Sequence, residues 1–81
     1  MEMSKQDYRQ AKRIEPIGEA GIEKCRVILN TGYAKVNEVM VDTFSAGAII
    51  AVYDRLNDEN KAKFRALPVV RAASVSFKLC K

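Results

Sequence analysis

The chain has 81 residues and a net charge of +4, and 48% of its residues are apolar, so we expect one small domain whose own core is only marginally large enough. It contains no His and two Cys, which excludes Cys–His and Ser–His catalytic pairs and argues against a zinc site. We therefore expect no metal and no cofactor. Homo-oligomerisation is the expected support for so small a core.

The first fifteen residues are polar and contain no apolar stretch of the kind that a signal peptide needs. The segment from Ser4 to Asp7 resembles a capping box, in which a carboxylate follows a Ser by three residues. A short helix and a disordered arm both fit residues 1–15. We expect the folded domain to cover residues 16–81.

Residues 19–30 are predicted to form a helix, because Ile22, Cys25 and Leu29 recur at helical spacing. Gly32 follows at the position where a glycine commonly ends a helix. The run from Cys25 to Leu29 also fits a strand, so the pattern leaves both alternatives open.

Residues 33–42 predict a short β-hairpin, because the segment is rich in Val, which favours strands. Asn37 and Glu38 lie at its centre, where a two-residue turn belongs. Asn tolerates the positive φ that such a turn needs, whereas Glu does not adopt it readily.

The longest apolar stretch, residues 43–56, is the segment around which the rest of the chain is expected to pack. Its apolar side chains cover nearly every side of a helix, which is typical of a buried helix or of one shared with a second chain. It is too short to span a membrane, which takes about 20 apolar residues. The predicted core and oligomer positions are Phe44, Gly47, Ile49, Ile50, Val52, Tyr53 and Leu56.

Residues 57–67 predict a further helix that begins with Asn57 as its cap and carries acidic residues in its first turn. It must end near Leu67, because a residue that precedes proline is steered away from helical geometry. Pro68 is suited to the first turn of the next element.

The tail, residues 69–81, fits two structures. A helix would align Val70, Ala73 and Phe77, whereas the alternation of apolar and polar residues from 73 to 80 is a strand pattern. The preceding proline favours the helix. The predicted fold is therefore mainly α: a small helical domain with a short β-hairpin at about residues 33–42.

No residue set predicts an enzyme. The glycines do not form a phosphate-binding loop, and Asp42 and Asp54 are more simply read as a helix cap and a surface residue. Cys25 lies on an apolar helical face and is expected in the core. Cys80, beside Lys81, is either a reactive thiol, because a nearby cation lowers a thiol pKa, or a terminal residue with no role.

The C-terminal third, residues 55–81, carries seven basic and two acidic residues. Such a segment can contact phosphates without reading a base sequence, although a solvated face is the simpler interpretation. The candidate nucleic-acid contacts are Lys61, Lys63, Arg65, Arg71 and Lys78.

One set of short segments lies between residues 41 and 68: Val41-Asp-Thr-Phe-Ser-Ala46, Val52-Tyr-Asp54, Leu56-Asn57, Glu59-Asn60, Lys63-Phe64 and Leu67-Pro68. This pattern, which covers about half of the chain, resembles one in small uncharacterised proteins of bacteriophage and prophage genomes. It implies a phage origin, a cytoplasmic setting in an infected host and a helical tail, and it names no site. Two functions are expected from the sequence: a non-enzymatic protein-interaction module that binds itself or a host protein, and alternatively a small basic nucleic-acid-binding protein.

Overall fold

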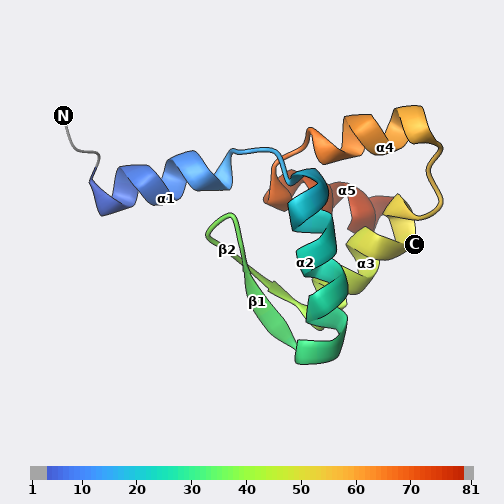
Figure 1. The fold of residues 1–81 in the computed structure, drawn as a ribbon, viewed down its shortest axis with the longest axis horizontal. Coiled ribbons are helices and arrows are strands. Elements are labelled where there is room, and N and C mark those ends of the chain that lie inside the picture. The colour runs from blue at the N-terminus through green and yellow to red at the C-terminus, as the bar shows by residue number, and fades with distance from the viewer. Residues whose placement is uncertain (1–3, 80–81) are drawn as a thin grey trace.

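The computed structural model describes residues 4–79 and confirms a mainly helical domain with a short antiparallel hairpin (Figure 1). Cys80, the candidate thiol, lies outside the described residues. In chain order the elements are α1 (Lys5–Arg13), α2 (Gly18–Thr31), β1 (Tyr33–Val36), β2 (Val39–Asp42), α3 (Thr43–Tyr53), α4 (Asp58–Arg65) and α5 (Val69–Leu79).

Polar side chains set the beginnings of three helices. Ser4, Asp42 and Asn57 each accept a hydrogen bond from the backbone N–H three residues later, at 3.1, 2.8 and 2.8 Å. These bonds satisfy N–H groups that have no partner within the first turn of a helix. At the other end, α3 stops at Tyr53, so Leu56 lies half-buried in the turn before α4 and not in the helix.

The hairpin has the predicted two-residue turn, and both turn residues have positive φ: 50° for Asn37 and 63° for Glu38. These values match a type I′ turn, whose twist suits the two strands that it joins. The strands pair from Tyr33 with Asp42 to Val36 with Val39. Glu38 therefore has a left-handed backbone geometry that residues with a Cβ rarely adopt.

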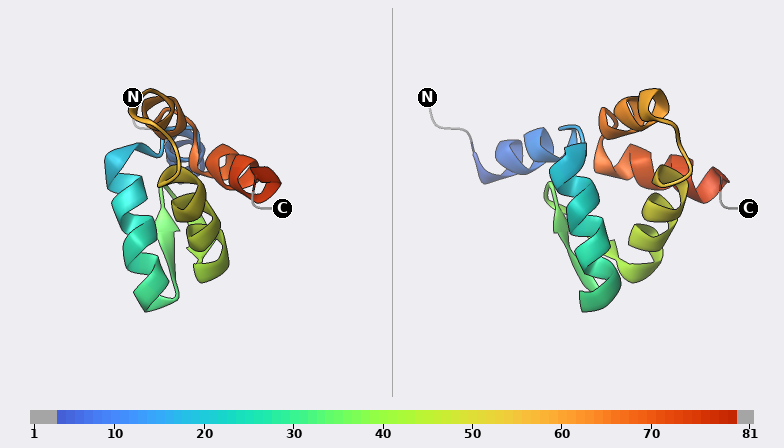
Figure 2. Two further views of the ribbon diagram at one scale, coloured as in Figure 1. Left: turned by 90° about the vertical axis from the view of Figure 1, so that its right-hand side faces the viewer. Right: turned by 45° about the vertical axis from the view of Figure 1, so that its right-hand side comes forward.

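The core lies where α2, α3 and the inner face of the hairpin meet α4 and α5, and Figure 2 shows α2 and α3 side by side in both of its views. The two helices also share the most extensive packing in the fold. Its buried apolar residues are Ile17, Ile22, Cys25, Ile28, Val36, Val41, Ala46, Ile49, Ile50, Val52, Tyr53, Phe64, Val69 and Ala72.

The face that α5 buries differs from the predicted one. The tail is a helix, but Val69, Ala72 and Ser76 face the core, while Val70 and Phe77 are exposed. The small side chains let α5 pack closely on α3, and buried Ser76 stays satisfied because its hydroxyl donates to the carbonyl of Ala72 at 2.7 Å. The tail, for which both a helix and a strand were left open, is a helix, and Val70 and Phe77, two of the residues that a helix aligns, do not face the core.

A similar shift occurs on α2. Ile28 is buried, whereas Leu29, predicted on the inward face, is 41% exposed. Consecutive side chains in a helix point about 100° apart. Because Ile28 points into the core, its neighbour Leu29 points toward the surface.

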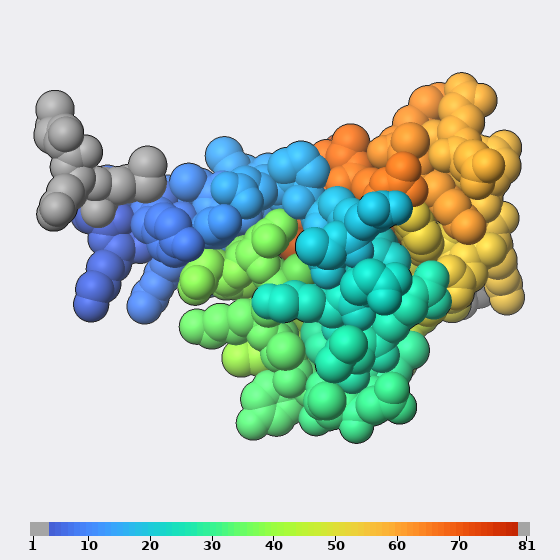
Figure 3. All heavy atoms as spheres, viewed as in Figure 1, coloured from blue at the N-terminus to red at the C-terminus, as the bar shows by residue number. Residues whose placement is uncertain are grey.

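Helix α1 extends away from the rest of the molecule, as the space-filling view shows (Figure 3). None of its residues is buried. The chain joins the main body directly after it, where the backbone N–H of Ile17 donates to the carbonyl of Leu67 at 2.7 Å, beside a bridge between Pro16 and Pro68.

Candidate functional site

An apolar groove runs along the outer side of α3, with α2 on one side and α5 on the other. Its volume is about 560 Å³. We call it the α3 groove, and its lining residues are Leu29, Thr43, Phe44, Gly47, Ala48, Ala51 and Phe77. Because exposed apolar surface is costly in water, such a groove is a candidate interaction site.

Two aromatic rings form one rim of the α3 groove. Phe44 was predicted as a core or oligomer position, and its 76% exposure shows that it is not part of the chain's own core. At 3.6 residues per turn it lies on the opposite side of α3 from buried Ala46 and Ile50. Its ring stacks on that of Phe77 from α5, with the centroids 5.5 Å apart and the planes at 22°. A stacked pair that is largely in contact with water presents a flat apolar surface.

The floor of the groove consists of small residues, and Gly47 is not required by the packing of its own chain. A Cβ at this position would meet only Cδ2 of Leu29, at 3.8 Å, which is an ordinary contact. By contrast, a Cβ at Gly21 would lie 2.4 Å from Cγ1 of Ile17. Glycine inside a helix costs roughly 0.5–1 kcal/mol relative to alanine. The fold of one chain therefore gives no reason for Gly47.

Helix α3 is held against α2 by contacts at both ends of α3. At one end, the backbone N–H and the hydroxyl of Thr43 both donate to the carbonyl of Gly32, at 2.9 and 2.8 Å. At the other, the guanidinium of Arg26 donates to both carboxylate oxygens of Asp54, at 3.1 and 2.6 Å. These contacts fix α2 against α3, so the groove is formed before any partner binds.

Hydrogen bonds at the two ends of α3 shift the pKa of two carboxyl groups. Hydrogen bonds from Arg26 hold the pKa of Asp54 below its ordinary value, and Asp54 in turn raises the pKa of Arg26. Hydrogen bonds from the backbone and side chain of Ser45 lower the pKa of Asp42. The two aspartates lie at opposite ends of α3, so they are not an acid–base pair.

Most of the residues predicted for the core or an oligomer contact lie in the core of the single chain. Ile49, Ile50, Val52 and Tyr53 are buried within the domain. Among the seven positions, the groove is lined by Phe44 and Gly47. Sequence reasoning did not identify Leu29, Ala48, Ala51 and Phe77 as lining residues of the groove. The available signal was the four-residue spacing of Gly47 and Ala51, which places two small residues on one helix face.

The basic residues predicted to bind nucleic acid are partly engaged in holding the fold. Arg65 donates to the hydroxyl of Tyr53 at 2.6 Å, and the ammonium of Lys61 lies 5.4 Å from the centroid of the same ring. Lys63 pairs with Glu59 at 3.6 Å on α4. Arg71 and Lys78 are exposed on α5. Three of the five cations are therefore already engaged by other side chains of the domain.

Cys25 is a free, fully buried thiol. Burial raises its pKa to about 11, so the reactive thiolate is scarce near neutral pH. Between residues 4 and 79, no group of three or more Cys, Asp or Glu side chains is arranged to hold a metal ion. In the same part of the chain, no helix has the length and apolar character needed to cross a membrane.

No protein-family model, curated protein sequence or solved structure matches the chain. The groove and the charged surfaces of the molecule are thus the basis for assigning a function.

Proposed function

We propose that the chain is a non-enzymatic protein-interaction module that binds a second copy of itself through the α3 groove. The observation that carries this proposal is the groove itself: a preformed apolar surface with an exposed aromatic rim and a small-residue floor. The unexplained glycine at position 47 supports it, because a glycine there allows another backbone to approach closely.

The surface is self-complementary. Phe44 projects from the first half of α3, and the small residues lie in its middle and second half. If two α3 helices cross antiparallel about a twofold axis between Gly47 and Ala48, each Phe44 lies over the second copy's Ala51. One surface then supplies both the projecting ring and the depression that receives it, as a twofold interface requires.

The charges fit the same arrangement. Residues 43–53 contain no charged side chain, so two copies of α3 meet without burying a charge. Charges begin directly beyond the helix, with Asp42 at its start and Asp54 and Arg55 at its end. In this antiparallel register Asp42 of one copy lies opposite Tyr53 of the second copy, and the two helix dipoles point in opposite directions.

Sedimentation equilibrium of the wild-type chain and of Ala51→Glu tests the proposal. Ala51 is exposed in one chain and Glu is a good helix former, so the variant keeps its fold, which far-ultraviolet circular dichroism checks. We expect a wild-type dimer and an Ala51→Glu monomer, because the dimer would bury an unpaired carboxylate. Ala62→Glu on α4 is the matched control, since Ala62 is also an exposed helical alanine but lies outside the groove.

A wild-type chain that remains monomeric at high micromolar concentration would overturn self-association. The groove would then be assigned to a helix of a different protein. The resemblance to small phage and prophage proteins supports a host protein in that case, in the cytoplasm of an infected cell.

A further inference from the structure

Helix α1 is a nine-residue helix without a buried residue. Isolated helices shorter than about 12–15 residues are marginal in water. The side chain of Ser4 caps it, Lys12 contacts Tyr8 and Glu15 of the same segment, and Nε of Arg13 donates to the carbonyl of Glu38 at 3.4 Å. An exposed helix with so few contacts is suited to binding something outside the domain.

One side of α1 is basic. Lys5, Arg9, Lys12 and Arg13 are spaced so that they fall within an arc of about 100° around the helix axis. Asp7, the one acidic residue of α1, lies on the opposite side of the helix. The four cations therefore point in a common direction.

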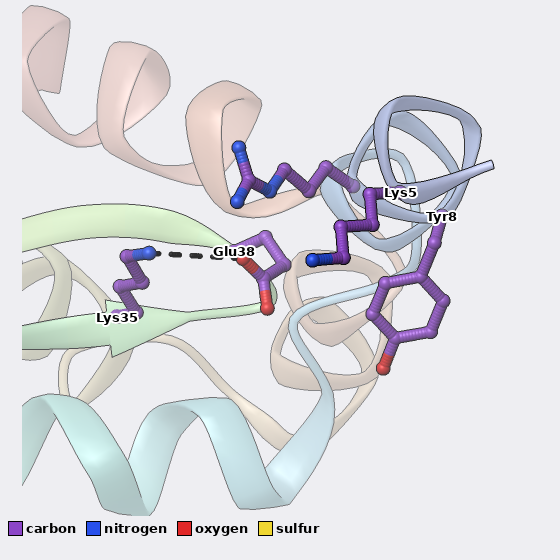
Figure 4. A pocket seen from close by; sticks show the side chains of 5 residues that line it. Lys5, Tyr8, Lys35 and Glu38 are labelled. Carbon is purple, nitrogen blue, oxygen red and sulfur yellow. Dashed lines mark ion pairs between the residues drawn. The ribbon is translucent and has the colours of Figure 1, made fainter.

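This basic side faces the hairpin across an open hollow of about 540 Å³, which is lined by Lys5, Tyr8, Arg9, Lys35 and Glu38. Figure 4 shows Lys5 and Tyr8 on α1 opposite Lys35 and Glu38, with the ion pair between the last two dashed.

A second hollow, of about 240 Å³, adjoins the first through Lys35 and Glu38 and adds two further lysines, Lys12 and Lys24. We call this concave region the α1–hairpin surface, and its basic residues are Lys5, Arg9, Lys12, Lys24 and Lys35.

The cations of this surface are only weakly neutralised. Nζ of Lys35 lies 3.9 Å from Oε2 of Glu38, and the two side chains are 58% and 30% exposed. Solvent therefore screens the attraction between them. Lys12 pairs with Glu15 at 3.4 Å, also at the surface. Within residues 4–79, Lys5 and Arg9 form no ion pair. Several positive charges are thus held near one another with little local compensation.

We propose that the α1–hairpin surface binds the phosphate backbone of a nucleic-acid duplex, without reading its sequence. A concave surface with several separated cations matches a row of phosphates, and each neutralised phosphate releases counterions. The surface is distinct from the basic C-terminal third, where Lys61 and Arg65 are engaged by Tyr53. The inference is also independent of the α3 groove, because α1 contributes nothing to it.

Two other anionic partners fit less well. A helix that lies in a membrane surface needs a large apolar face, and the apolar side chains of α1 are Tyr8 and Ala11. Single strands are held mainly by bases stacked on aromatic rings, and Tyr8 is the one aromatic ring that lines the two hollows. A duplex, which presents phosphates on its outside, is favoured over both.

Fluorescence anisotropy with a labelled random-sequence DNA duplex tests the proposal across a salt series. If about five phosphates are neutralised, the logarithm of the binding constant falls with the logarithm of salt with a slope of about −4 to −5. The double variant Lys5→Ala, Arg9→Ala should bind more weakly and reduce the steepness of that slope by about 2. Both residues are exposed on a helix, and Ala is a strong helix former, so the fold is retained.

The matched control is Lys61→Ala, Lys63→Ala on α4, which should leave affinity and slope unchanged. Glu38→Gln removes the acid that lines both hollows and should increase affinity at low salt. A double variant at Lys5 and Arg9 that binds like the wild type would overturn the proposal, as would binding to vesicles that contain an anionic lipid but not to the duplex. Duplex binding by monomeric Ala51→Glu keeps this test separate from that of self-association.

Discussion

Replacing Glu38 by glycine should stabilise the protein. The φ of Glu38 is 63°, and left-handed geometry costs a residue with a Cβ roughly 1–2 kcal/mol, a cost that glycine avoids. Against this stand the greater freedom of glycine in the unfolded chain, about 0.4–1 kcal/mol, and the loss of the exposed ion pair with Lys35, a few tenths of a kcal/mol. The net gain is about 0.5 kcal/mol. With an unfolding entropy of about 2.1 cal/mol/K per residue, Tm should rise by about 3 °C.

Thermal unfolding followed by circular dichroism measures the effect, with all variants at one protein concentration because self-association raises Tm. Glu38→Gln is the control: it removes the charge and the ion pair but keeps the Cβ, so it should not raise Tm. The reasoning fails if Glu38→Gly is no more stable than Glu38→Gln, because the backbone strain would then be absent.

Two further predictions concern the reactivity of the Cys25 thiol and the loss of stability at acid pH. In a Cys80→Ser chain, an alkylating reagent should modify Cys25 only as fast as the domain opens, because the thiol is buried. Denaturant should therefore accelerate labelling strongly. Rapid labelling of the native protein would contradict the burial of Cys25. Because the folded-state pKa of Asp54 is lowered, the unfolded chain takes up its proton first as pH falls, and the free energy of unfolding should decrease below about pH 4. In Asp54→Asn, denaturant unfolding across pH should show a shallower decrease, and an unchanged slope would argue against the pair with Arg26.

Much of the fold follows from local sequence signals. Asn57 marks the start of a helix because its side chain can cap one, and Asn37 marks a turn because it tolerates positive φ. These effects act over a few residues, so the sequence alone reveals them. The prediction that Asn37 and Glu38 form the turn held even though Glu is poorly suited to it, since the pairing of the two strands outweighs the preference of one residue.

The directions of the helix faces could not be predicted in the same way. α3 is apolar on nearly every side, so its periodicity does not indicate which side meets the core, and Phe44 was assigned inward for that reason. On α5, Val70 and Phe77 satisfy the helical spacing as well as Val69 and Ser76 do. Which of these two faces of α5 is buried depends on where α2 and α3 lie, and their positions are a property of the assembled fold.

The basic surface was missed for a related reason. Counting charges along the chain favoured residues 55–81, because the cations of α1 are interspersed with Asp7 and Glu15. The helical spacing of Lys5 and Arg9 was readable, but their neighbour Lys35 comes from the hairpin and is brought close only by folding.

Oxidative cross-linking at Ala48 tests the proposed self-association most directly. The proposed twofold axis passes beside this residue, so Ala48→Cys in a Cys80→Ser chain should lie close to the same cysteine of the second copy. A disulfide needs Cα atoms about 4.4–6.8 Å apart, which the small residues of the groove allow. We predict a cross-linked dimer for Ala48→Cys under mild oxidation and none for Ala62→Cys on α4. An Ala48→Cys chain that cross-links no more than Ala62→Cys would contradict antiparallel pairing of α3.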